Sequence, residues 1–229
     1  MARLSQLLAT HGSILVLDAA SQQVQVGLLR AAAPAIWRQG AAEAGTALFT
    51  ASQAVLAEAG VSLEAVGAFL YCEGPGSMLG TRTVAMAVRA WQVLRPRPAY
   101  AYQSLSLLAH NILFTGAAAP FSVVTDARRD SWNCVRVSAD GIVQPLQRCP
   151  AAQLAATHDP LYSPAVFRAW AAPPRPLRDY PYAVAALLDA HAGVDLFQAS
   201  PEPDAFQHEA PAYKKWSAQV HSAATAAPR

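Results

Sequence analysis

Residues 70–82 read Leu70-Tyr71-Cys72-Glu73-Gly74-Pro75-Gly76-Ser77-Met78-Leu79-Gly80-Thr81-Arg82, and an apolar run follows as far as Leu94. This order predicts a strand over residues 65–71, a tight loop, and a helix that Ser77 caps. Glycine and proline in the loop favour a sharp turn or a close backbone approach. Because the first turn of a helix leaves N–H groups free, the loop is either a phosphate-binding loop or a structural turn.

The loop does not fit the known phosphate-binding motifs. A P-loop has Lys-Ser or Lys-Thr after its last glycine, and this chain has Thr81 and Arg82 there. The third glycine, Gly80, stands one position too late for the dinucleotide fingerprint. Ser77 is also not the centre of a G-x-S-x-G elbow, because Pro75 and Leu79 hold the glycine positions. The residues alone therefore favour a structural turn.

Composition limits the class of protein. A chain of 229 residues can form one large domain or two small ones, and its charged fraction of 14% leaves apolar surface that a partner would cover. A net charge of +2 gives no support for nucleic-acid binding by itself. Three cysteines without C-x-x-C spacing predict neither a disulfide framework nor a zinc site, which favours a reducing cytoplasm. No apolar run is long enough to span a bilayer, so we expect no membrane contact.

A pattern near the start of the chain occurs a second time. The apolar strand 14–17 ends on Asp18 and precedes two shorter strands at 24–28 and 35–37; likewise strand 121–125 ends on Asp126 and precedes a strand at 132–137. The repetition predicts an α/β protein with a duplicated β-meander in two lobes. We expect a first lobe over residues 1–116 and a smaller, proline-rich second lobe over 117–229, whose C-terminal segment is a candidate to return to the first lobe.

Two helices are predicted in the first lobe, over residues 45–59 and 80–94. The second of them is apolar on two sides. Val84, Val88 and Trp91 form one stripe at helical spacing, and Met86, Ala90 and Val93 form another. One stripe can pack on a sheet, so the other needs a second layer or another protein.

Four motifs, in this order along nearly the whole chain, resemble the TsaB (YeaZ) family: Ile14-Leu15-Val16-Leu17-Asp18-Ala19-Ala20, Gly74-Pro75-Gly76-Ser77 with Gly80 and Arg82, Asp126-Ala127-Arg128, and Pro211-x-Tyr213. The family is related to the glycoproteases (peptidase M22). The resemblance implies a two-lobed actin-like fold of the ASKHA class, built on a ribonuclease H-like motif.

The resemblance also implies a function in tRNA modification. It is that of a non-catalytic subunit of the bacterial machinery that makes N6-threonylcarbamoyladenosine (t6A) at position 37 of tRNA. Its implied partners are a TsaD-like catalytic subunit and a TsaE-like ATPase, with tRNA contacted indirectly through the complex. The heterodimer with TsaD would form through the two helices of the first lobe, and the residues expected at that interface are Leu48, Val55, Met86, Val88, Trp91 and Val93.

The same resemblance makes a set of residues candidates for a vestigial nucleotide or phosphate loop: Asp18, Gly74, Gly76, Ser77, Gly80, Arg82, Asp126 and Arg128. The turn after Asp18 lacks the Gly and Thr that contact phosphate oxygens, so we expect no cofactor, or weak binding of ATP or ADP. No two histidines are four residues apart, as the metal pair of TsaD-like enzymes requires, and we expect no metal site and no catalytic residue.

Two alternatives remain open. In the first, the chain is an actin-fold enzyme, either an ATP-dependent phosphotransferase or an M22-type hydrolase, that uses Asp18 and Asp126. In the second, it is a diverged homodimeric interaction protein, because the same apolar helices can pair with themselves.

Overall fold

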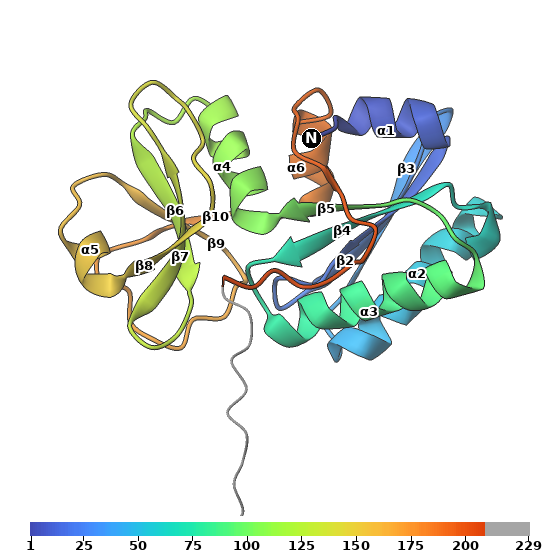
Figure 1. Ribbon diagram of the computed structural model, residues 1–229, viewed down its shortest axis with the longest axis horizontal. Coiled ribbons are helices and arrows are strands. Elements are labelled where there is room, and N and C mark those ends of the chain that lie inside the picture. Colours follow the sequence, from blue (N-terminus) through green and yellow to red (C-terminus); the bar gives the residue numbers. More distant parts are fainter. Residues whose placement is uncertain (209–229) are drawn as a thin grey trace, which may run out of the picture.

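The computed structural model describes residues 1–208 as two lobes (Figure 1). The first is built on a six-stranded sheet and the second on a five-stranded one, and five strands of the first sheet have the same connectivity as the second. In the first lobe, β1 (Ser13–Asp18), β2 (Val24–Arg30) and β3 (Ala33–Gly40) form an antiparallel meander. Strand β4 (Ala68–Gly74) pairs in parallel with β1, and β5 (Ala99–Gln103) pairs in parallel with β4. The strand order is therefore 3-2-1-4-5.

The second lobe repeats this order. Its meander consists of β6 (Phe121–Asp126), β7 (Ser131–Val137) and β8 (Gln147–Pro150), and β9 (Leu161–Pro164) and β10 (Arg178–Tyr180) follow in parallel. The repeated connectivity confirms the predicted two-lobed, actin-like α/β fold with a duplicated meander.

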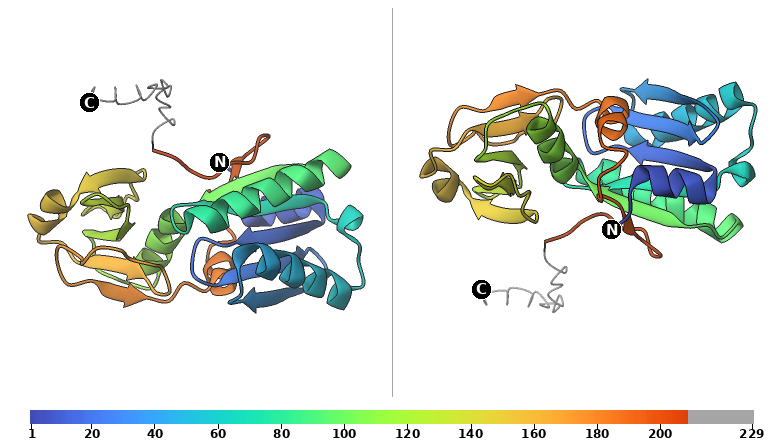
Figure 2. Two further views of the ribbon diagram at one scale, coloured as in Figure 1. Left: turned by 90° about the horizontal axis from the view of Figure 1, so that it is seen from below. Right: turned by 90° about the horizontal axis from the view of Figure 1, so that it is seen from above.

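Both helices predicted in the first lobe are present and cover one face of its sheet. Helix α2 (Ala44–Ala59) packs on β2 and β3, and α3 (Met78–Leu94) packs on β4 and β1 (Figure 2, left). As predicted, Ser77 caps α3, because its hydroxyl oxygen accepts the Gly80 N–H at 3.2 Å. Helix α2 ends at Gly60, whose φ of 66° is the left-handed conformation that glycine adopts without strain.

The other face of the first sheet is covered by α1 (Leu4–His11) and α6 (Val184–Ala190) (Figure 2, right). Helix α4 (Ser104–Phe114) contacts both β4 and β5 of the first sheet and β6 and β7 of the second, so one apolar core continues from lobe to lobe. The remaining elements are short: η1 (Leu63–Ala65), α5 (Ala151–Ala155) and β11 (Gln198–Ala199).

The chain from β11 to Phe206 lies against the first lobe, where the Phe206 N–H donates to the Glu73 oxygen. Strand β11 pairs antiparallel with β5, and Phe197 pairs with Ala2. Within residues 1–208, no helix combines the length and the apolar character that crossing a bilayer requires. The Pro211-x-Tyr213 motif lies outside the described residues, and the division at residues 116 and 117 stays a prediction.

Candidate functional site

The glycine loop packs directly on the turn that joins β1 to β2. The Ser77 N–H donates to the Ala20 carbonyl oxygen over 2.7 Å. A Cβ added to Gly76 would lie 2.3 Å from the Ala20 oxygen, and one added to Gly80 would lie 2.0 Å from the Ala19 oxygen. Backbone contact with this turn therefore accounts for both glycines, without a phosphate.

This contact gives a stability prediction. We expect Gly80→Ala to lower the free energy of unfolding by about 3 kcal/mol, because the new methyl group overlaps a backbone oxygen that has no rotamer to change. Gly45→Ala is the matched control: nothing lies within 4 Å of its added Cβ, and we expect a gain of about 0.5–1 kcal/mol in α2. Urea unfolding of both variants measures the difference, and equal stability of the two would contradict the contact.

Asp18 is fully buried, and both oxygens of its carboxylate accept hydrogen bonds from groups of the chain itself. Its Oδ1 accepts the Ala20 N–H at 2.9 Å, and its Oδ2 accepts the hydroxyls of Tyr102 and Tyr182, each at 2.7 Å. Burial raises the pKa of Asp18 above its usual value, against the lowering effect of Tyr102, Ala20 and Tyr182. The oxygens that a metal ion would need already accept hydrogen bonds from protein donors.

Tyr182 reaches Asp18 from the segment that returns from the second lobe. The side-chain amide of Gln25 binds this segment at two points. Its Nε2 donates to the backbone carbonyl oxygen of Tyr182 over 3.0 Å, and its Oε1 accepts the Val184 N–H at 2.9 Å. The Gln22 N–H also donates to the Val166 oxygen over 2.9 Å. The β1–β2 turn and the start of β2 are therefore hydrogen-bonded both to Val166 of the second lobe and to the segment that returns from it.

Asp126 occupies the equivalent position in the second lobe, but its surroundings differ. Its carboxylate accepts the backbone N–H groups of Arg128, Trp170 and Ala171, at 2.6, 2.6 and 2.9 Å. Burial raises its pKa, but these three donors outweigh that effect and the net shift is downward. Arg128 is exposed, and its guanidinium lies over the ring of Trp170.

The structure gives the two aspartates separate partners. Asp18 bonds to tyrosines within the core, and Asp126 bonds to a surface loop. Arg82 is exposed on α3. Among residues 1–208 no three or more His, Cys, Asp or Glu side chains gather as a metal site would require. The predicted loop residues therefore divide between a contact inside the first lobe and a turn on the second.

The predicted interface residues also divide, and several need correction. Leu48, Val55 and Val88 are fully buried between the helices and the first sheet, so their assignment to an outer surface is wrong. Trp91 is 9% exposed and packs on the rings of Phe69 and Phe49. The physical reason is helical periodicity: the stripe that contains Val88 and Trp91 is the one that faces the sheet. Met86 and Val93, on the other stripe, are exposed.

Sequence reasoning missed several residues. Leu79 is exposed and stands seven residues before Met86, which places it on the same face of α3 as the predicted Met86 and Val93, and that spacing is visible in the sequence. Gln25 alternates with Val24 and Val26, a pattern typical of a half-exposed strand, so the sequence gives no signal that it is buried. Tyr102 and Tyr182 carry no local signal, because their partner Asp18 is 84 and 164 residues away.

Comparisons with known proteins agree with this architecture. Residues 44–145 match the family model of TsaD, described as tRNA N6-adenosine threonylcarbamoyltransferase. The solved structure of YeaZ from Pseudomonas aeruginosa is 25% identical, with a TM-score of 0.59, and the match covers 80% of this chain and 91% of that one. The resemblance to the TsaB (YeaZ) family is confirmed.

A second structure from Pseudomonas aeruginosa supports the same YeaZ-like fold. It is described as an uncharacterized protein with similarity to peptidase YEAZ, and it is 23% identical, with a TM-score of 0.58 and coverage of 80% of this chain and 90% of that one. No curated protein matches the YeaZ-like chain.

Proposed function

We propose that this YeaZ-like chain is a non-catalytic subunit of the t6A machinery that binds and supports a TsaD-like catalytic subunit. The observation that carries the proposal is an apolar surface on α3 that nothing in the described chain covers. A TsaE-like ATPase and tRNA would join through the resulting complex. The first lobe, residues 1–116, would supply the contact.

The surface is a continuous strip along α3, which we call the α3 stripe: Leu79, Met86, Ala90 and Val93. Leu79, Met86 and Val93 are 67%, 61% and 85% exposed. Phe49 of α2, also exposed, stands beside the stripe with its ring against Trp91. Exposed apolar side chains are ordinary when scattered, but a row of them on one helix face is typical of a docking surface.

Charge borders the stripe on one side. Arg82 and Arg89 are exposed and also spaced by seven, so they follow the same helix face next to the apolar row. An apolar centre with a charged rim is the usual layout of a protein interface. We infer a partner that offers an apolar helix or groove with acidic residues on the matching edge.

The hydrogen bonds of Asp18 support a non-catalytic role. Its oxygens accept three protein donors, and the glycine loop contacts the β1–β2 turn instead of leaving a space between them. We expect isothermal titration calorimetry with ATP and Mg²⁺ to give no binding heat at micromolar concentrations. Micromolar binding that Asp18→Asn abolishes would contradict the proposal and favour the actin-fold enzyme.

The proposal is tested most directly in the organism that encodes the chain. We expect deletion of the gene to remove t6A from tRNA, measured by mass spectrometry of digested tRNA, and the wild-type gene to restore it. The purified chain should also co-elute with the TsaD-like protein of the same organism. Unchanged t6A after deletion, together with elution as a homodimer alone, would overturn the proposal in favour of the homodimeric alternative.

A further inference from the structure

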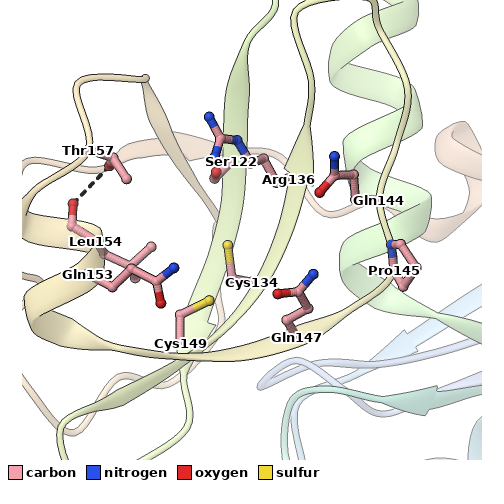
Figure 3. Close-up of a pocket in the computed structure, with 10 residues that line it drawn as sticks. All are labelled: Ser122, Cys134, Arg136, Gln144, Pro145, Gln147, Cys149, Gln153, Leu154 and Thr157. Atoms are coloured by element: carbon pink, nitrogen blue, oxygen red, sulfur yellow. Dashed lines mark hydrogen bonds between the residues drawn. The ribbon is translucent and has the colours of Figure 1, made fainter.

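The second lobe contains a small cavity with two cysteines in its wall. It has a volume of about 120 Å³ and lies where the edge of the second sheet meets α5 and the loop before β8 (Figure 3). Two cysteines contribute their thiols, Cys134 from β7 and Cys149 from β8. The other lining residues are mostly polar: Ser122, Arg136, Gln144, Pro145, Gln147, Gln153, Leu154 and Thr157.

The two thiols are neighbours on one face of the sheet. Cys134 pairs with Gln147 and Cys149 pairs with Trp132, so the cysteines stand diagonally across adjacent strands. Their sulfur atoms lie inside the group of lining side chains (Figure 3), and the side chains are 6% and 7% exposed. Both are free thiols. Diagonal positions have Cα atoms about 7–8 Å apart, a separation beyond the usual reach of a disulfide but suited to an ion held between two sulfur atoms.

An ion pair stands at one side of the cavity. Arg136 of β7, two residues after Cys134, lines the cavity and is paired with Asp159 at 3.0 Å.

We propose that this cavity binds a soft, two-coordinate monovalent cation of the Cu(I) class between the sulfur atoms of Cys134 and Cys149. Thiolate sulfur is the ligand that such cations prefer. Two Cu–S bonds form as two S–H bonds break, both protons pass to solvent, and the oxidation state of the metal does not change. The bis-thiolate complex carries one net negative charge.

The ligand set selects against the commoner thiophilic metal. Structural zinc takes four ligands, and residues 1–208 contain no group of three or more His, Cys, Asp or Glu side chains that would supply them. A two-coordinate cation needs only two sulfur ligands, and Cys134 and Cys149 supply them. The inference is independent of the proposed subunit function.

The test is a titration of the reduced full-length chain with Cu(I) under anaerobic conditions, with bicinchoninate as the competing chromophoric ligand. We expect one tightly held Cu(I) per chain, and a loss of at least 100-fold in affinity for Cys134→Ser and for Cys149→Ser. Cys72→Ser is the matched control, because Cys72 is a buried thiol in the first lobe, and it should keep full affinity. Circular dichroism confirms that each variant is folded.

Three results would overturn the proposal. The first is a wild-type chain that loses all its Cu(I) to bicinchoninate. The second is undiminished affinity in folded Cys134→Ser and Cys149→Ser. The third is formation of a Cys134–Cys149 disulfide with diamide, identified by peptide mass mapping, in a chain that does not retain Cu(I).

Discussion

The double variant Met86→Asp/Val93→Asp is expected to lose at least 1000-fold in affinity for the TsaD-like subunit, which corresponds to about 4 kcal/mol. Both side chains belong to the α3 stripe and are well exposed in the chain alone. In the complex each would place a carboxylate in an apolar contact, where a charge without a partner is costly. Calorimetry or surface plasmon resonance with the purified partner measures the change.

The fold should survive these substitutions, because neither side chain contributes to the core. We expect each aspartate to cost about 0.5 kcal/mol of helix propensity. Ile142→Asp is the matched control: Ile142 is as exposed as Met86 but lies in the second lobe, and its variant should bind normally. Val88→Glu is unsuitable, because Val88 is fully buried and its charge would unfold the lobe. Wild-type affinity in the double variant would exclude the α3 stripe as the docking surface.

The second large effect is on stability. We expect Asp18→Ala to lower the free energy of unfolding by about 4 kcal/mol, because the Ala20 N–H and the hydroxyls of Tyr102 and Tyr182 lose their acceptor in a buried place. Asp18→Asn keeps one oxygen and should cost about 1–2 kcal/mol. Chemical denaturation followed by fluorescence measures both. Asp189→Ala, a change at an exposed carboxylate near the end of α6, serves as the control and should be near neutral.

The stability lost in Asp18→Ala should also depend on pH. Burial raises the pKa of Asp18 above 3.8, so its stabilising contribution is fully present below the unfolded-state pKa and diminishes as the pH rises through the folded-state value. The gap in stability between wild type and Asp18→Ala should therefore narrow with rising pH across that range. A loss below about 1 kcal/mol at every pH would contradict the buried network and leave Asp18 free for a ligand.

The parts of the fold that depend on local pattern were predictable from the sequence. The apolar strand before Asp18 and its repeat before Asp126 identified the duplicated meander, and Ser77 identified the start of α3. These signals are local, since alternation, capping and turn residues act over a few positions.

The site was less predictable, for two physical reasons. Sequence spacing shows that α3 has two apolar stripes but does not say which one faces the sheet. Val88 was therefore assigned to the partner interface, whereas its side chain is buried against the sheet. Asp18 was compared with the metal-binding and phosphate-binding carboxylates of related folds. Its actual partners, Tyr102 and Tyr182, are set by packing of distant segments, which no single stretch of sequence encodes.

The return of the chain from the second lobe to the first has a consequence for biosynthesis. Asp18 leaves the ribosome long before Tyr182, α6 and β11, which emerge only after the strands of the second lobe. Until then, one face of the first sheet is covered by α1 without α6, and Asp18 lacks one of its three hydrogen-bond donors. A ribosome stalled before residue 182 would therefore present an incomplete lobe that is open to proteases and chaperones, although its strands β1 to β5 have all been made.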